Sequence, residues 1–206
     1  GGGNDTYIDD RAGDTVTDNI SEGTDTIHSF VSYTTSENVE NLTLMDNFNN
    51  PDIDGTGNSL DNILTGNSGD NTLSGDDGND VLDGGGGNDF LDGGSGIDTA
   101  IFTSASNIVD LNLTYAQYTG DGISTLISIE NIDGGDGNDL LIGNRSDNIL
   151  IGGNGTNILV GDYGNDSLFG GSDPDVLFGG FGNDRLFGEE GRDVLSGGLG
   201  NDWLTG

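Results

Sequence analysis

The sequence predicts an all-β fold, a parallel β-roll (a solenoid related to the β-helix) of stacked coils with calcium in the turns. Three observations predict it: a nine-residue period, a glycine-rich first half in each unit, and a leucine near the end of each unit. A turn followed by a very short strand reverses the chain once, so two units close one coil of eighteen residues.

The composition excludes several classes of protein. The 206 residues fit one domain, and they include 37 acidic residues, four arginines and no lysine, for a net charge of −33. A nucleic-acid partner is excluded because four arginines cannot neutralise a phosphate backbone. A membrane span is excluded because no apolar run approaches about 18 residues. With no cysteine, disulfides and thiolate sites are excluded as well.

Composition alone would predict disorder, because low hydrophobicity with high charge seldom supports a core. The repeat pattern decides otherwise. Five nonapeptides occupy residues 57–101 and eight occupy residues 134–205, and the units within each block follow one another without a gap. Position 1 is glycine in all thirteen units, and position 8 is leucine in all but one, where Ala100 stands.

Each unit divides into two parts with different physical roles. The first six residues, such as 179–184, are turn formers in which glycine permits positive φ and inward carbonyl oxygens. The last three, such as 185–187, form a strand whose central side chain points one way and whose flanks point the other. We therefore expect two parallel sheets with the leucines between them, stable only as an array.

Position 6 is aspartate or asparagine in every unit, and it is the candidate metal ligand. Coils stack at about 4.8 Å, which is about twice a calcium–oxygen bond of roughly 2.4 Å. A Ca²⁺ ion between turns would bind two of these side chains and turn carbonyls; Mg²⁺ fits less well because it retains its water. Oxygen-only donors favour calcium over zinc or copper. The candidate side-chain ligands are Asp80, Asp89, Asp98, Asp139, Asp166, Asp175, Asp184, Asp193, Asp202, Asn71, Asn148 and Asn157.

The position-4 glycines are the candidate carbonyl ligands, namely Gly78, Gly87, Gly96, Gly137, Gly155, Gly164, Gly182, Gly191 and Gly200. We expect roughly 5–10 ions, with asparagine-containing pairs weaker because they bring less charge. The strongest pairs should be aspartate with aspartate: 80 with 98, 166 with 184, 175 with 193, and 184 with 202. The competing interpretation is that Asp and Asn serve only as turn formers.

The motif Gly-Gly-x-Gly-x-Asp-x-Leu-x resembles the repeats-in-toxin (RTX), or haemolysin-type, calcium-binding repeats. Clear matches are residues 84–92, 134–142, 179–187 and 197–205. The resemblance implies a calcium-loaded parallel β-roll like the C-terminal roll of serralysin-type proteases. It also implies export from a Gram-negative-type bacterium by a type I system. Ser146, Asp173-Pro174 and Glu189-Glu190 depart from the motif.

Outside the regular blocks, residues 1–56 and 102–133 look like degenerate repeats with longer loops, so we expect one continuous roll over 1–206. Residues 109–115 alternate as a half-buried strand, and residues 128–132 echo residues 38–42. A linker between two rolls is the alternative for 102–133. Because both ends interrupt the repeat pattern, we expect a segment of a larger protein.

Positions 7 and 9 of block 134–205 place apolar side chains on both outer faces. This pattern suits docking of a neighbouring domain or copy, or it reflects only the strand propensity of these residues.

Neither His-Glu-x-x-His nor Gly-x-Ser-x-Gly occurs, so we expect no catalysis in this segment. We expect a secreted calcium-binding module that folds outside the cell. The alternatives are an accessory C-terminal domain of an exported metalloprotease, lipase or alginate epimerase, or a spacer in an adhesin or toxin.

Overall fold

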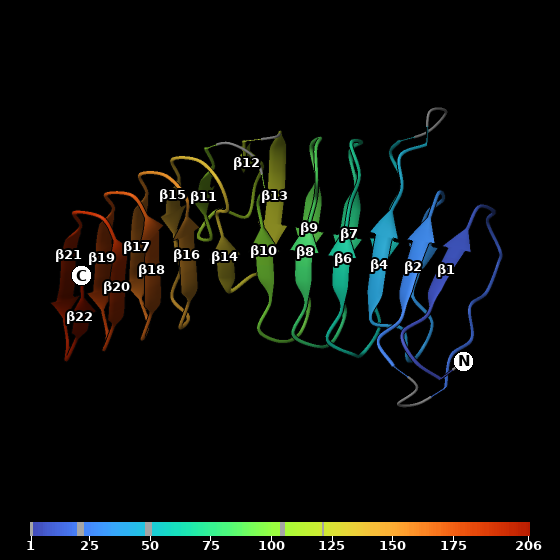
Figure 1. The fold of residues 1–206 in the computed structure, drawn as a ribbon, viewed down its shortest axis with the longest axis horizontal. Helices are drawn as coiled ribbons and strands as arrows, with labels where there is room; N and C mark the ends of the chain where they lie inside the picture. Colours follow the sequence, from blue (N-terminus) through green and yellow to red (C-terminus); the bar gives the residue numbers. More distant parts are fainter. Residues whose placement is uncertain (1, 20–22, 48–50, 104–105, 121) are drawn as a thin grey trace. The chain divides into compact units, whose positions relative to one another are not determined.

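The computed structural model describes residues 2–19, 23–47, 51–103, 106–120 and 122–206. Every regular element in this part of the chain is a β-strand (Figure 1). It therefore includes no helix with the length and apolar character needed to cross a membrane. The chain forms two compact units, residues 1–99 with 124–129, and residues 100–123 with 130–206.

The first unit has two parallel sheets (Figure 1, blue to green). One follows the order β1 (Thr6–Asp9), β2 (Thr26–Ser29), β4 (Asn41–Leu44), β6 (Ile63–Thr65) and β8 (Val81–Asp83). The other follows the order β3 (Tyr33–Thr34), β5 (Gly55–Thr56), β7 (Thr72–Ser74), β9 (Phe90–Asp92) and β13 (Ile123–Ile127). Strand β10 (Thr99–Ile101) includes the boundary between the units.

The second unit repeats this arrangement, and its strands between residues 149 and 199 are longer, with five or six residues each. One sheet contains β14 (Asn131–Asp133), β16 (Ile149–Gly153), β18 (Ser167–Ser172), β20 (Arg185–Glu190) and β22 (Trp203–Thr205). The other contains β11 (Ile108–Asp110), β15 (Leu140–Ile142), β17 (Ile158–Tyr163), β19 (Val176–Phe181) and β21 (Val194–Leu199). The short strand β12 (Gln117–Tyr118) also belongs to this unit.

The register confirms coils of eighteen residues within the regular blocks. Leu168 pairs with Leu186 in one sheet, and Leu159 pairs with Leu177 in the other. The position-8 side chains of the inner coils are almost completely buried: Leu64, Leu73, Leu82, Leu91, Ala100, Leu141, Leu150, Leu159, Leu168, Leu177 and Leu186. Leu204, in the final coil, is 44 % exposed. The predicted parallel β-solenoid with an internal leucine stack is confirmed.

The first coils depart from the eighteen-residue length while keeping the same pairing. Thr6 pairs with Thr26, Thr26 with Asn41, and Asn41 with Ile63. The sequence separations at this edge are therefore 20, 15 and 22 residues. The strands align because Ile27, Leu42 and Leu64 are all buried at the same level of the core. The extra or missing residues lie in the loops, where they do not disturb the stack.

The stretch between the regular blocks differs from one expectation. The strand predicted over residues 109–115 was wrong beyond Asp110, where β11 ends. The Asn112 N–H donates to Asp110 Oδ1 and the Leu113 N–H donates to the Asp110 carbonyl, which closes a turn. The predicted echo of residues 38–42 in 128–132 is confirmed locally, since Asn38 and Ser128 both have positive φ and the next residue is buried. The expectation that residues 1–206 form one continuous roll remains a prediction.

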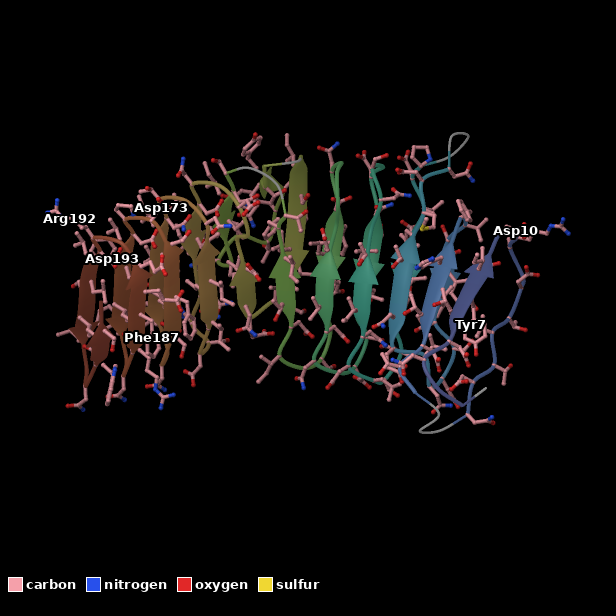
Figure 2. All side chains as sticks on the ribbon, viewed as in Figure 1. Tyr7, Asp10, Asp173, Phe187, Arg192 and Asp193 are labelled. Carbon is pink, nitrogen blue, oxygen red and sulfur yellow. The ribbon has the colours of Figure 1, made fainter. Side chains whose placement is uncertain are left out.

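The flanking strand side chains of block 134–205 point outward, as predicted. Ile149, Ile158 and Phe178 are each about two-fifths exposed. Phe169 stacks on Phe187, with ring centroids 4.9 Å apart, and Tyr163 stacks on Phe181 at 4.8 Å. Figure 2 labels Phe187, which lies in β20 and is half-buried. These spacings equal the stacking distance between coils, so each pair joins successive coils on the outer surface.

Candidate calcium sites

The position-6 side chains form a ladder along the turns. Wherever a regular block contains a position-6 residue one coil later, the backbone N–H of the earlier position-6 residue donates to its Oδ1. Asp89, near the end of its block, donates instead to Ser124 Oγ. For the four aspartate pairs, these distances are 2.7 Å (80 to 98), 2.9 Å (166 to 184), 3.0 Å (175 to 193) and 3.0 Å (184 to 202). Asn148 donates to Asp166 in the same way at 2.8 Å. The predicted stacking of position 6 on position 6 is therefore present, and it is a cross-coil contact rather than a local turn.

Asparagine takes part in this ladder as well as aspartate does. Asn157 Oδ1 accepts from the Asp139 N–H at 2.9 Å, and Asn71 donates its own N–H to Asp89. Both residue types offer the single acceptor oxygen that the contact requires. This explains why the two alternate at position 6. The contact therefore gives position 6 a structural role that is independent of any ion.

The second carboxylate oxygen has a different environment. Oδ2 of Asp80, Asp139, Asp166, Asp175 and Asp184 is buried and accepts no hydrogen bond within the described part of the chain. These five residues are at most 2 % exposed. A buried carboxylate oxygen without a donor is costly unless a cation neutralises it. The donor set of hard, anionic oxygens therefore fits Ca²⁺.

The same burial perturbs the acidity of these groups. Desolvation raises the pKa of Asp80 to about 6 and that of Asp166 to about 7, against the opposing hydrogen bonds from Asn62 and Asn148. The charges of Asp98 and Asp184, respectively, add to the increase. Desolvation also raises the pKa of Asp139, Asp175 and Asp184. A bound cation would reverse this tendency because it stabilises the ionised form.

Comparison with protein families identifies the repeats. The model of the RTX calcium-binding nonapeptide repeat matches residues 56–91, 65–100, 128–159, 151–186, 160–195 and 169–204. These matches overlap and together cover 122 of the 206 residues. The chain belongs to the RTX calcium-binding nonapeptide repeat family. Its repeats bind several Ca²⁺ ions, and they make the chain a calcium-binding module of a type found in secreted proteins. Comparison with curated proteins finds no match.

The position-1 glycine of the RTX repeat has a role that sequence reasoning missed. A Cβ on Gly84 would lie 2.9 Å from Asp89 Cγ, and one on Gly161 would overlap Asp166 Oδ2 and the Gly179 carbonyl oxygen. Position 1 thus provides the space that the carboxylate of the same repeat occupies. Its φ is not positive, so turn conformation does not explain it. The sequence signal for this role is that a glycine stands five positions before every position-6 residue.

The position-4 glycines behave as the turn argument predicts. All nine candidates have positive φ, from +103° at Gly155 to +153° at Gly96. A Cβ at Gly87 would overlap the Gly69 carbonyl oxygen of the preceding coil. The carbonyl oxygens of position 4 therefore point along the stack, from one turn toward the next. Their role as calcium ligands remains a prediction, as does that of each position-6 side chain.

A second ladder, at position 5, was not anticipated. The backbone N–H of Asn165 donates to Asp147 Oδ1 at 2.6 Å, Asn183 donates to Asn165 at 2.9 Å, and Asn201 donates to Asn183 at 3.0 Å. Here the later coil donates to the earlier one, the reverse of position 6. Pro174 occupies position 5 and has no N–H, so it cannot donate to Thr156. The departure at Asp173-Pro174 therefore interrupts this ladder.

The position-6 ladder also extends into the irregular first coils. The Asp5 N–H donates to Asp25 Oδ1 at 2.6 Å, and the Asp25 N–H donates to Glu40 Oε2 at 2.8 Å. Each of these residues directly precedes a strand of the same sheet, as the regular position-6 residues do. Sequence reasoning missed Asp25 and Glu40 as ladder members because their separations are not multiples of nine.

Proposed function

We propose that this chain is a calcium-driven folding module of a larger secreted protein. Without calcium it is largely unfolded and can be exported; outside the cell, Ca²⁺ closes the turns and the roll forms. The observation that supports this proposal is the row of buried Oδ2 atoms at position 6, which lack hydrogen-bond donors in the described residues. Such atoms favour the unfolded chain until a cation neutralises them.

The apo chain has few other means of offsetting these charges. It has four arginines against 37 acidic residues. The ion pair between Arg11 and Asp10 is solvent-exposed and spans 3.8 Å. An exposed pair of this kind contributes about 0–1 kcal/mol. Calcium is therefore the natural counter-charge for the turns.

The energetics suit a switch between compartments. Extracellular calcium modules bind at about 10⁻⁴–10⁻³ M, far above cytosolic calcium. A site at ten times its dissociation constant adds about 1.4 kcal/mol, and six independent sites add about 8 kcal/mol. The stability of an ordinary domain is about 5–15 kcal/mol. Calcium alone can thus account for the difference between an unfolded and a folded chain.

Type I export fits the same scheme, because RTX repeats are typical of proteins that use it. We propose that this segment is not itself catalytic and serves the stability or export of the protein that contains it. The position-6 carboxylates support this assignment, since those of Asp98, Asp166, Asp175 and Asp184 each already accept a backbone N–H. The alternatives, an accessory domain of an exported enzyme or an adhesin spacer, share the same calcium chemistry.

The test is the hydrodynamic radius of the whole chain in chelator, in millimolar Ca²⁺ and in millimolar Mg²⁺. The proposal predicts an expanded chain in chelator and in Mg²⁺, and a contracted one in Ca²⁺. Equal radii in all three conditions would contradict calcium-driven folding. Binding of Ca²⁺ without contraction would retain the calcium module but overturn its role as a folding switch.

A further inference from the structure

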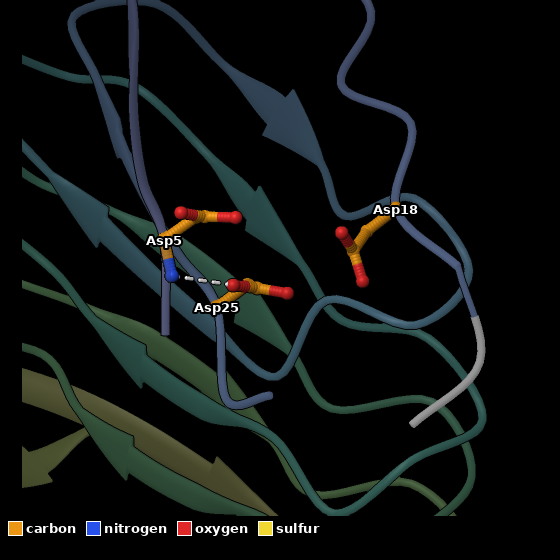
Figure 3. A group of neighbouring side chains, drawn as sticks. All are labelled: Asp5, Asp18 and Asp25. Atoms are coloured by element: carbon orange, nitrogen blue, oxygen red, sulfur yellow. Dashed lines mark hydrogen bonds between the residues drawn. The ribbon is translucent and has the colours of Figure 1, made fainter. Parts of the chain in front are cut away.

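A cluster of three carboxylates lies in the first coils, outside the residues matched by the RTX family model. Asp5, Asp18 and Asp25 each offer one carboxylate oxygen, and these oxygens all lie within 4.8 Å of one another. Figure 3 shows the three side chains converging on one region from different segments of the chain. The cluster therefore differs from the two-carboxylate arrangement of the regular turns.

The three residues reach this region for different reasons. Asp5 and Asp25 directly precede β1 and β2, and the hydrogen bond from the Asp5 N–H to Asp25 Oδ1 makes them neighbours in the ladder. Asp18 belongs to the longer connection between these two strands. Its side chain is only 6 % exposed, although it lies in a loop of a highly charged protein. The extra length of this coil thus brings in a third carboxylate.

Asp25 provides an independent indication of a ligand. The residue is fully buried, and its Oδ1 accepts the Asp5 N–H. Its Oδ2 is also buried and has no hydrogen-bond partner among the described residues. In Figure 3 this oxygen points toward Asp18, into the region that the three carboxylates enclose. An acceptor without a donor in such a place is stabilised by a cation.

We propose that Asp5, Asp18 and Asp25 form a Ca²⁺ site of the N-terminal coil that is separate from the nonapeptide sites. A calcium–oxygen bond of about 2.4 Å lets one ion contact two oxygens up to about 4.8 Å apart, and all three carboxylate oxygens meet that limit. Only hard anionic oxygens are offered, which suits calcium. Three formal charges should bind the ion more tightly than two.

Bound there, the ion joins the connection that contains Asp18 to the edge formed by β1 and β2. Thr6 and Thr26 begin the pairing of these strands, one residue after Asp5 and Asp25. The site therefore holds a coil whose length departs from the repeat and which the nonapeptide geometry alone does not fix. It does not depend on the regular turns having the proposed switching role.

The test is the number of Ca²⁺ ions bound by the folded full chain, measured by equilibrium dialysis for wild type, Asp18→Asn and Asp14→Asn. Asp14 is the matched control, because it lies in the same connection, carries the same charge and is exposed. The proposal predicts that Asp18→Asn loses one ion and that Asp14→Asn loses none. Unchanged stoichiometry in Asp18→Asn would overturn this site alone. A wild-type chain that binds no Ca²⁺ would overturn it together with the proposed function.

A second measurement keeps the test decisive if Asp18→Asn does not fold. Tyr7 lies close to the cluster, because it belongs to β1 and follows Asp5 by two residues, which places both side chains on the same side of the extended chain. Tyr7 should therefore sensitise the luminescence of Tb³⁺, a calcium mimic, bound at the site. Tyr7→Phe should reduce that luminescence well below the level of Tyr115→Phe, a matched control whose tyrosine is 65 % exposed. Equal luminescence in the two variants would contradict an ion at the cluster.

Discussion

The two oxygens of a position-6 carboxylate have separate tasks. In Asp166, Oδ1 accepts the Asn148 N–H at 2.8 Å, while Oδ2 is buried without a donor in the described chain. The first contact holds one coil on the next, and asparagine can replace it. The second oxygen brings a negative charge that only aspartate supplies. Asp166 therefore makes a structural contact both with and without calcium. Its buried charge destabilises the folded chain until calcium binds.

Asp166→Asn should have opposite effects with and without calcium. In chelator it should stabilise the folded state by roughly 1–3 kcal/mol, because the hydrogen bond persists and a buried charge disappears. In calcium it should raise the Ca²⁺ midpoint of folding, because a charged ligand is lost. Denaturant titrations in both conditions measure the two effects.

The matched control is Asp147→Asn, an equal charge change at the exposed position 5, where Oδ1 accepts the Asn165 N–H. It should leave the calcium midpoint nearly unchanged. If both variants behaved alike, net charge rather than a ligand role would explain the result.

Acid should stabilise the calcium-free chain. The folded-state pKa values of about 6 for Asp80 and about 7 for Asp166 lie above the ordinary 3.8, so the folded state binds more protons than the unfolded state between these values. Stability in chelator should therefore rise as pH falls from about 7 toward 4 and be lost as pH rises again. In calcium the trend should reverse, since protons compete with the ion. Urea unfolding at several pH values distinguishes the two cases; the same trend in both would be contrary to a calcium site at these carboxylates.

At the scale of the turn, the four glycines 84–87 show that glycine serves different purposes at each position. Gly84 leaves room for the Asp89 carboxylate, Gly85 and Gly87 have positive φ, and Gly86 has neither constraint. The nearest atom to a Cβ on Gly86 would be Ser68 Cα at 3.9 Å, an ordinary contact. Glycine is therefore required at positions 84, 85 and 87, whereas another residue can replace Gly86.

Gly84→Ala and Gly86→Ala test this distinction within one repeat. The first should cost about 1–3 kcal/mol, because its Cβ overlaps a fixed carboxylate. The second should be neutral or stabilising by up to about 1 kcal/mol, since alanine restricts the unfolded chain. Thermal unfolding in calcium measures both. Equal losses in the two variants would show that position 1 is not reserved for the carboxylate.

The turn at Glu189-Glu190 contains a strained residue. Glu189 has φ +66° at a position where the repeat normally has glycine, and such a conformation costs roughly 1–2 kcal/mol for a residue with a Cβ. Glu189→Gly should therefore stabilise the chain by about 1 kcal/mol. Glu190→Gly, an identical change in charge at negative φ, should destabilise it slightly. Calorimetric melting of both variants gives the comparison; a stabilised Glu190→Gly would point to charge relief instead.

For the whole molecule, the nine-residue period was enough to predict the solenoid, the eighteen-residue coil and the leucine stack. These follow from one side chain per strand pointing inward, as Leu168 and Leu186 do. The period could not predict the first coils, in which successive contacts are 20, 15 and 22 residues apart in the sequence. The loops of these coils differ in length, while the buried side chains of their strands remain aligned. It also could not reveal contacts between coils, such as Asp25 with Glu40, because these depend on the stacking itself.

The net charge of −33 opposes compaction of the chain as a whole. General screening by salt weakens this repulsion at exposed positions but leaves the buried position-6 carboxylates almost unaffected. A divalent ion that binds in the turns reduces the net negative charge of the chain. It also neutralises the buried position-6 carboxylates, which screening by salt does not reach. We therefore expect that an equal ionic strength of sodium chloride cannot replace calcium.

The most direct measurement is far-UV circular dichroism of the whole chain as Ca²⁺ is added from chelator, with Mg²⁺ and sodium chloride as controls. We expect a cooperative change from coil to β-structure in Ca²⁺ alone, with a midpoint near 10⁻⁴–10⁻³ M. A spectrum that is already fully β in chelator and does not change with Ca²⁺ would contradict the account, since the leucine stack would then fold without its ions.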